Sequence, residues 1–289
     1  MPALLEVRNL SRTFGGIRAV DDLSFDAARD GITGLIGPNG AGKTTVFNLI
    51  TGVCNPSGGS VRLNGAELTG RRPDEIVRIG VARTFQNIRL FGRMTCLQNV
   101  MVPLLARGTC GPIQSLFRTP AVSAGEREAK KAALEIMAET GTLDVADRIA
   151  ATLPYGRQRR LEIARALACF GAEELFSAGS PDRLLLLDEP AAGMNEAETR
   201  ELARAIGDLK GRFGLTVLLI EHHIDMVMEL CSHIVVLDRG MLLAEGTPRT
   251  VRSDERVVAA YLGRTREARP RSRRAEIREE TRTEKEKLS

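Results

Sequence analysis

The sequence lacks any hydrophobic run long enough to cross a membrane. A membrane-spanning helix needs about 18 consecutive apolar residues, and the apolar runs in these 289 residues are much shorter. Residues 1–6, Met-Pro-Ala-Leu-Leu-Glu, do not show the basic and then apolar segments of a signal peptide. We therefore expect a cytosolic chain.

The sequence also lacks the cysteine pattern of a disulfide framework or a zinc site. The cysteines are odd in number, scattered and never spaced as CxxC; they are Cys54, Cys96, Cys110, Cys169 and Cys231. Disulfide-rich domains and zinc sites both depend on such spacings. We expect these thiols to be reduced and mostly buried.

The sequence also lacks an excess of positive or negative charge, except at its C-terminal end. The sequence has 41 Lys and Arg against 37 Asp and Glu, and residues 264–289 hold 10 of the basic and 6 of the acidic side chains, which leaves 31 of each in residues 1–263. Nucleic-acid-binding proteins concentrate positive charge on a folded face. We therefore expect no nucleic-acid partner, a neutral body at residues 4–263, and a charged, disordered tail at 264–289.

What the sequence does contain is an alternation of short apolar runs and amphipathic stretches. The runs at 184–189 and 216–221 are wholly apolar up to an acidic end, as in parallel strands buried on both faces. In residues 90–168, approximately, Ala, Glu and Leu dominate and apolar positions recur every three or four residues. This pattern favours a helical subdomain inserted into a sheet-based one. Strands are predicted at residues 4–8, 21–27, 31–36, within 56–65, and at 81–85, 184–188, 216–221 and 233–238, with helices from residue 43 and at 73–80, 196–212 and 254–262.

A phosphate-binding loop follows the strand at 31–36. Residues 37–44 fit GxxxxGK[ST] between a predicted strand and a predicted helix, which is the context that this motif requires. Backbone N–H groups and the helix N-terminus attract phosphates, Lys43 reaches the β- and γ-phosphates, and the Thr44 hydroxyl ligates Mg²⁺. A glycine turn beside a surface lysine is the alternative. The predicted nucleotide contacts are Gly37, Pro38, Asn39, Gly40, Ala41, Gly42, Lys43, Thr44 and Thr45.

Two acids at the end of an apolar strand form the second half of such a site. At the carboxyl end of a parallel strand, Asp188 faces the metal bound by Thr44, and Glu189 lies near the γ-phosphate, where it polarises an attacking water. A strand that ends in two acids before Pro190 is also a common transition to a loop. The function of the pair therefore depends on Lys43.

A third motif makes the layout resemble the ATP-binding subunits of ABC transporters. Leu153-Pro-Tyr-Gly-Arg-Gln158, followed by Arg-Arg-Leu-Glu-Ile-Ala-Arg165, is similar to the ABC signature LSGGQ and its helix. The resemblance covers residues 4–263. It implies an α/β fold of the ABC ATPase type, a P-loop NTPase with a mainly parallel sheet core, an N-terminal antiparallel β subdomain and an inserted helical subdomain. It also implies ATP and Mg²⁺ as cofactors and ATP hydrolysis as the activity.

The resemblance implies roles for single residues. Phe14 would stack on adenine, although an ordinary core phenylalanine is the alternative. Gln86 would approach Mg²⁺ and water, and His222 would contact the γ-phosphate, whereas the neighbouring His223 is expected to be exposed and non-catalytic. The implied catalytic residues are Glu189, His222 and Gln86; the implied metal ligands are Thr44, Gln86 and Asp188; and the signature contacts to nucleotide are Leu153, Tyr155, Gly156 and Gln158.

Several residues depart from the general pattern. Pro154 replaces a serine that offers a hydroxyl and an N–H, and proline has neither. Tyr155 replaces a glycine, Arg157 stands where Gln, Glu or Asp is usual, and Asn195 replaces the commoner Asp. The same residues in these motifs are typical of one subgroup of the family, so we do not interpret these changes as loss of activity.

That subgroup is the ATPases of branched-chain amino acid importers. The runs Arg83-Thr-Phe-Gln-Asn-Ile-Arg-Leu-Phe and Leu218-Leu-Ile-Glu-His are similar to theirs, and this chain resembles the longer-insert member, with an extra stretch near 105–130. Urea, short amides or another amino acid remain alternative cargoes. A soluble ABC ATPase acting on DNA or ribosomes and a non-hydrolysing binding module are the rival functions. Residues 169–183, longer than in relatives, are predicted to form a surface elaboration on the far side from the nucleotide.

The resemblance also implies partners. The signature lies on the helical lobe, away from its own phosphate loop, so the ATPase would pair head to tail with itself or with a second homologous ATPase. This pair would drive two integral-membrane permease subunits, and indirectly would act with a substrate-binding protein. The implied location is peripheral, on the cytoplasmic face of the inner membrane.

Overall fold

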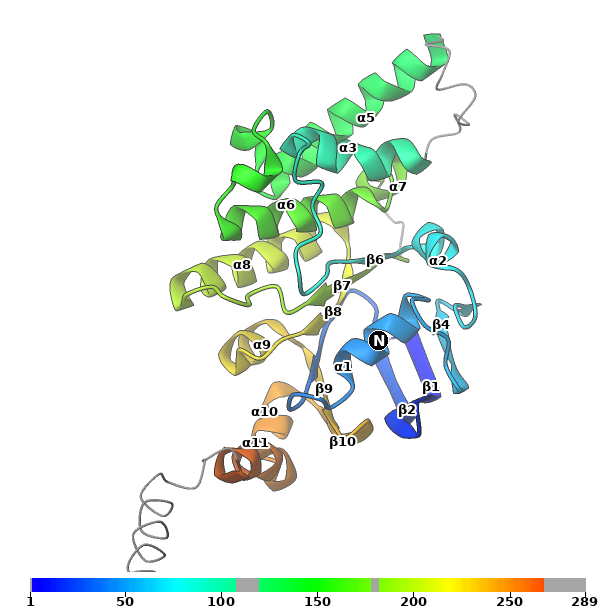
Figure 1. The fold of residues 1–289 in the computed structure, drawn as a ribbon, viewed down its shortest axis with the longest axis vertical. Helices are drawn as coiled ribbons and strands as arrows, with labels where there is room; N and C mark the ends of the chain where they lie inside the picture. The colour runs from blue at the N-terminus through cyan, green and yellow to red at the C-terminus, as the bar shows by residue number, and fades with distance from the viewer. Residues whose placement is uncertain (1, 108–119, 178–181, 268–289) are drawn as a thin grey trace, which may run out of the picture.

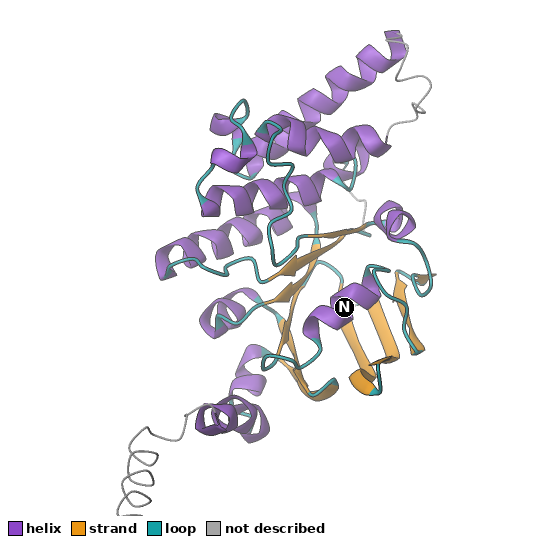
Figure 2. Cartoon of the chain, in the orientation of Figure 1, coloured by secondary structure: helices purple, strands orange, loops and turns teal. Residues whose placement is uncertain are grey.

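Two sheets and the helices around them make up the computed structural model, which describes residues 2–107, 120–177 and 182–267 (Figure 1). One sheet has four strands in the order β2-β1-β4-β5, and the other has six in the order β10-β9-β3-β8-β7-β6. A group of helices lies above the larger sheet in Figure 2. Within the described residues, no helix combines the length and the apolar character that a membrane crossing requires.

The smaller sheet is antiparallel and is built from the first part of the chain. Its strands are β1 (Ala3–Phe14), β2 (Ile17–Ala28), β4 (Gly58–Leu63) and β5 (Ala66–Glu67). In β1, Leu5, Val7 and Leu10 are fully buried, while intervening residues are exposed or half-buried. This alternation is what a sheet with one solvated face requires. The predicted antiparallel β subdomain is confirmed as part of the fold.

The larger sheet is parallel except at one edge. Its strands are β3 (Ile32–Ile36), β6 (Val81–Arg83), β7 (Leu184–Asp188), β8 (Thr216–Ile220), β9 (His233–Asp238) and β10 (Met241–Gly246). Every residue of β3, β7 and β8 is buried, as the continuous apolar runs predicted. The antiparallel edge strand β10 was not predicted, because its sequence, Met-Leu-Leu-Ala-Glu-Gly, does not alternate between apolar and polar residues.

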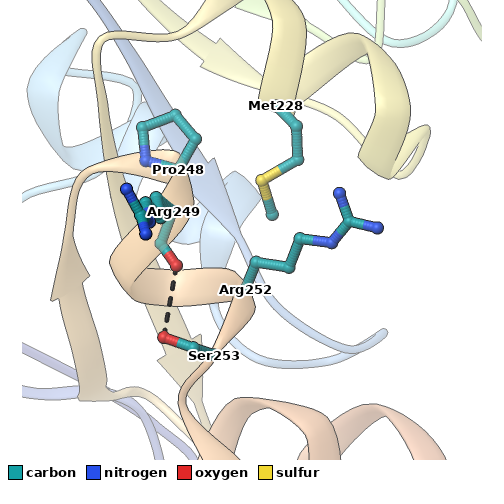
Figure 3. Close-up of a pocket in the computed structure, with 5 residues that line it drawn as sticks. All are labelled: Met228, Pro248, Arg249, Arg252 and Ser253. Carbon is teal, nitrogen blue, oxygen red and sulfur yellow. Dashed lines mark hydrogen bonds between the residues drawn. The ribbon is translucent and has the colours of Figure 1, made fainter.

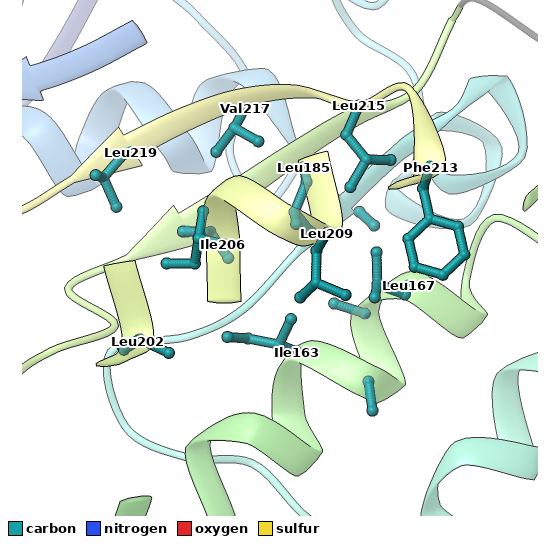
Figure 4. Close-up of a cluster of buried hydrophobic side chains, with 14 of the residues drawn as sticks. Ile163, Leu167, Leu185, Leu202, Ile206, Leu209, Phe213, Leu215, Val217 and Leu219 are labelled. Atoms are coloured by element: carbon teal, nitrogen blue, oxygen red, sulfur yellow. The ribbon is translucent and has the colours of Figure 1, made fainter. Parts of the chain in front are cut away.

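Side chains of the larger sheet face two separate cores. Leu185 and Leu187 pack with α6 (Tyr155–Ala168) and α8 (Glu196–Phe213), and Figure 4 shows these helices against β8. The alternate residues Leu184 and Leu186 pack instead with α1 (Lys43–Ile50) and the smaller sheet. The sheet therefore separates α1 from α6, a point that matters for the site.

Helices make up most of the remaining chain. The helical part contains α3 (Cys96–Arg107), α5 (Pro120–Glu139), short 3₁₀ turns at Leu143–Val145 and Ala150–Thr152, and α6. The other helices are α2 (Pro73–Ile79), α7 (Ala172–Phe176), α9 (Ile224–Leu230), α10 (Pro248–Arg252) and α11 (Glu255–Glu267). The last helix runs to Glu267, so residues 264–267 are helical although the disordered tail was predicted to begin at 264. The rest of that tail, 268–289, lies outside the described residues, as do residues 108–119 of the predicted extra stretch, which include Cys110.

The segment 169–183 is more deeply integrated than the predicted surface elaboration. Phe170 and Leu175 are only 2% exposed. The buried Arg183 guanidinium donates hydrogen bonds to the carbonyl oxygens of Leu175 (3.0 Å) and Phe213 (2.6 Å). It donates a third to Ser177 (3.2 Å). Arg183 thus fastens the described part of the segment to the end of α8.

We expect Arg183→Met to lower the free energy of unfolding by about 2–4 kcal/mol, because three carbonyl oxygens lose a charged donor. Urea titration measures this change. Arg212→Met is the matched control, since Arg212 pairs with Glu139 on the surface (3.0 Å, 61% and 36% exposed) and should cost less than about 1 kcal/mol. Equal effects of the two substitutions would contradict the assigned role of Arg183.

Candidate functional site

The loop 37–42 joins β3 to α1 and curls tightly because of its glycines. Gly37 has a φ of 153°, and a Cβ there would lie 2.2 Å from the Leu237 carbonyl oxygen. Gly42 has a φ of 100°, and its Cβ would lie 2.4 Å from the Ala19 carbonyl oxygen. Both positions therefore admit only glycine. Since α1 begins at Lys43, its first unpaired N–H groups lie at this loop.

The Lys43 ammonium lies inside the loop. Its Nζ donates to the carbonyl oxygens of Gly37 (2.8 Å) and Pro38 (3.1 Å), and the residue is only 6% exposed. Asn39, Gly40 and Thr44 are exposed, whereas Pro38 and Ala41 are buried and shape the loop from behind. A cation surrounded by backbone amides provides a site for an anion such as a phosphate.

Asp188 ends β7 with its carboxylate buried. Its Oδ2 accepts a hydrogen bond from Nη2 of Arg83 (2.7 Å), and the two side chains are 1% and 6% exposed. Its Oδ1 is buried without a hydrogen-bond partner. Burial raises the pKa of Asp188, and the hydrogen bond and charge of Arg83 oppose that rise. One carboxylate oxygen thus remains available for a cation.

Sequence reasoning missed Arg83. Besides Asp188, its Nη1 donates to Asn48 Oδ1 of α1 (2.7 Å) and lies 3.3 Å from Thr51 Oγ1. The guanidinium therefore links three segments, β6, α1 and β7. The available signal was an arginine within the predicted strand 81–85.

Glu189, Gln86 and His222 meet although they are far apart in sequence. Nε2 of Gln86 donates to Glu189 Oε2 (2.8 Å), and Nε2 of His222 lies 2.8 Å from Glu189 Oε1. Glu189 has a φ of 48°. This left-handed conformation costs about 1–2 kcal/mol for a residue with a Cβ. The backbone strain turns the carboxylate out of the strand and toward both partners.

Glu221, also missed from the sequence, anchors the loops on either side. Its carboxylate is 1% exposed and accepts from the backbone N–H of Ala191 (2.7 Å) and of His222 (2.9 Å). It also contacts Nδ1 of His223 at 3.2 Å. His223 is exposed, as expected, and its ring contacts Glu221, whereas His222 is the histidine that contacts Glu189.

Phe14 lies at the end of β1 with 45% of its surface exposed. The alternative of an ordinary core phenylalanine is therefore wrong. The Arg12 guanidinium lies over the ring, 4.5 Å from its centroid. A ring exposed at the end of the hairpin is suited to stack on a flat base.

The structure does not bring the signature residues to the phosphate loop of the same chain. They begin α6, across the sheet from α1 (Figure 1). Leu153 is buried, and its carbonyl oxygen accepts from Nε2 of Gln158 (2.8 Å), so both residues close the first turn of α6. Tyr155 is 44% exposed and Gly156 is half-buried, which leaves them open to another molecule.

A separate hollow of about 420 Å³ lies between α9 and α10 (Figure 3). It is lined by Met228, Pro248, Arg249, Arg252 and Ser253. None of these residues belongs to the predicted site. The chemistry-bearing groups instead gather along the edge of the sheet.

The order of strands in the larger sheet explains why these groups gather at one edge. The strands β3, β8, β7 and β6 are neighbours and pair in parallel, so their carboxyl ends lie at one edge. The phosphate loop follows β3, His222 follows β8, Glu189 follows β7, and Gln86 follows β6. An anion cradle thus lies on the same sheet edge as a carboxylate, an amide and an imidazole, an arrangement suited to phosphoryl transfer to water.

Known proteins with similar sequences are ATP-binding subunits of transporters. The family model "ABC transporter" matches residues 20–192, and "Branched-chain amino acid ATP-binding cassette transporter" matches residues 241–266. The high-affinity branched-chain amino acid transport ATP-binding protein BraF of Pseudomonas aeruginosa is 44% identical over 260 residues, covering 90% of this chain and 98% of BraF. The corresponding protein LivG of Escherichia coli is 41% identical with the same coverage.

Solved structures match as well. The ADP conformation of MJ1267, an ATP-binding cassette of an ABC transporter, is 30% identical with a TM-score of 0.76, covering 91% of this chain and all of that one. The dimeric cassette MJ0796 shares the fold, with a TM-score of 0.68 at 24% identity, covering 85% of this chain and 99% of that one. The predicted ABC ATPase fold is thereby confirmed. The chain belongs to the ABC transporter family and is one of its ATP-hydrolysing cassettes.

Proposed function

We propose that this chain is the ATP-binding and hydrolysing subunit of an importer of branched-chain amino acids. The observation that carries the ATPase chemistry is the hydrogen-bonded group of Glu189, Gln86 and His222, on the sheet edge that also holds the phosphate loop. The cargo rests on the relatives, whose names state branched-chain amino acid transport. The comparisons do not favour urea, amides or a non-transport role.

The loop 37–42 and the start of α1 would bind the phosphates of ATP. The ammonium of Lys43 would exchange its two carbonyl acceptors, on Gly37 and Pro38, for β- and γ-phosphate oxygens. Thr45 and the N–H groups of the first turn would add donors. Phe14 would stack on adenine beside Arg12.

Thr44, Asp188 and Gln86 would hold Mg²⁺. The residues fit this ion, because the unpartnered Oδ1 of Asp188 is a hard oxygen ligand and the Thr44 hydroxyl is exposed beside the loop. When bound, Mg²⁺ would neutralise charge that develops on the phosphate oxygens. Gln86 would leave Glu189 in order to join the ligand set, which would free Oε2 of that carboxylate.

Glu189 would then orient the attacking water and accept its proton. His222 lies 2.8 Å from the other carboxylate oxygen, so it would hold the glutamate in position and present its ring to the γ-phosphate. The buried Glu221 would keep His222 in place through the backbone N–H.

The site would be completed by a partner cassette, either a second copy or a homologous ATPase. The exposed Tyr155 and the half-buried Gly156, at the start of α6, would contact an ATP held by the partner's phosphate loop. Leu153 and Gln158 would contribute by shaping that turn. Two permeases and a substrate-binding protein would complete the importer, with this chain at the cytoplasmic face of the inner membrane. Co-purification with both permeases, and leucine binding by the binding protein, would test this assembly.

We expect Glu189→Gln to lower kcat for ATP hydrolysis by about 100-fold or more, because the amide cannot accept the proton of water. ATP binding should persist, and size-exclusion chromatography should show a trapped dimer in the presence of ATP. Glu135→Gln is the control, since Glu135 is exposed on α5. Normal hydrolysis by Glu189→Gln would remove Glu189 from the proposed role.

We expect Lys43→Ala to weaken ATP binding by about 10- to 100-fold, because the phosphates lose a charge-assisted donor. Calorimetric titration of the full chain with ATP measures the affinity. Lys131→Ala is the matched control, because Lys131 is 81% exposed on α5. This variant should bind ATP with the affinity of the wild type. An unchanged affinity of Lys43→Ala would contradict the role of the loop.

A further inference from the structure

An ion pair with no predicted function lies between α6 and the segment 85–89. Nη1 of Arg159 is 2.6 Å from Oε2 of Glu162, and the two side chains are 0% and 1% exposed. Arg159 is among the largest fully buried side chains of the described residues. Burying an arginine and a glutamate is costly, and such a pair seldom stabilises a fold more than apolar side chains would. Its partners therefore indicate what it does.

Both members of the pair bind the backbone that carries Gln86. Arg159 donates from Nη1 to the carbonyl oxygen of Phe85 (2.7 Å) and from Nη2 to that of Gln86 (2.8 Å). Glu162 Oε1 accepts from the N–H groups of Phe85 and Arg89, each at 3.3 Å. The segment 85–89 is thus held by four hydrogen bonds to one turn of α6.

The same guanidinium also reaches the exposed end of α6. Nη2 of Arg159 donates to the Tyr155 hydroxyl at 3.0 Å. A continuous route therefore runs from Tyr155 through Arg159 to the Gln86 backbone, and from the Gln86 side chain to Glu189. One planar guanidinium with its donors in a rigid fork can hold these groups in a single geometry, whereas a lysine ammonium cannot.

We propose that Arg159 and Glu162 are positioning residues that make the segment 85–89 and the first turn of α6 move as one body. Nucleotide on the chain's own phosphate loop displaces Gln86, and the pair transmits that displacement to Tyr155 and Gly156, which face the partner's ATP. Each site thereby reports its occupancy to the other site of the dimer. The inference rests on the proposed function, because it assigns Gln86 to one ATP and Tyr155 to another.

Hydrogen–deuterium exchange of the full chain tests this transmission. The measurement uses a non-hydrolysable ATP analogue with Mg²⁺, at a protein concentration where light scattering shows monomers. No partner then covers the start of α6, so any response there travels within one chain. In the wild type we expect slower exchange at residues 37–45 and a changed exchange at both 85–89 and 155–158.

Arg159→Met/Glu162→Leu removes the pair and fills its space with apolar atoms, which keeps the fold stable. We expect this variant to retain the response at 37–45 and to lose the response at 155–158. Arg159→Lys keeps the charge opposite Glu162 but not the forked guanidinium, so it should lose the response at 155–158 as well. If the double variant does not fold, Arg159→Lys still tests the proposal. Arg160→Met is the control, because the neighbouring Arg160 pairs with Glu201 of α8 (2.6 Å) and not with the segment 85–89.

ATP hydrolysis by the full chain gives a second readout. Loss of positioning should lower kcat by about 10-fold or more in Arg159→Lys while KM for ATP changes less than about two-fold. An equal fall of kcat in Arg160→Met would assign the effect to the stability of α6 and overturn the proposal. A response at 155–158 that persists in a folded Arg159 variant would overturn it too.

The wild-type response distinguishes a failure of the proposed ATP site from a failure of the proposed transmission. If residues 37–45 do not respond to the nucleotide, the proposed ATP site itself fails. If they respond and 155–158 do not, the ATP site stands and the transmission through Arg159 and Glu162 is wrong.

Discussion

Parallel pairing of the four strands β3, β8, β7 and β6 is the constraint on which the site depends. Parallel strands end at the same edge, so the residues that follow each strand are delivered to one place. Those strands are buried on both faces, and their side chains divide into two cores above and below. The apolar burial that stabilises the sheet therefore also sets the geometry of the loop 37–42, Glu189, His222 and Gln86.

Buried charge gathers around this edge, and each buried charge is held by specific partners. Asp188 is paired with Arg83, Glu162 with Arg159, and Glu221 with backbone N–H groups. Such groups contribute little to stability after the cost of removing them from water. They contribute geometry instead, because a buried ion pair tolerates few alternative arrangements. Glu189 adds local backbone strain at the same place, which the surrounding network holds.

The phosphate loop and the signature lie on opposite sides of the larger sheet within one cassette. The sheet stands between α1 and α6, so Tyr155 and Gly156 cannot approach Lys43 of the same chain while the core is intact. The proposed contact of the signature with nucleotide would therefore be made in a dimer, to an ATP on the partner cassette. The contacts of Arg159 with the segment 85–89 provide the link between the two faces that such a dimer needs.

The sequence by itself determined the fold class, the strands of the parallel core and the residues of the phosphate loop, Asp188 and Glu189. These features depend on neighbours in the chain: continuous apolar runs, glycines that permit positive φ, and a strand that ends in acids. It did not reveal the edge strand β10, nor Arg83, Glu221 and the pair Arg159–Glu162. Their meaning comes from contacts with distant residues, such as Arg83 with Asp188 and Arg159 with Gln86. Only the tertiary structure decides which buried charges meet, because a charge in the sequence carries no record of the partner that offsets its loss of water.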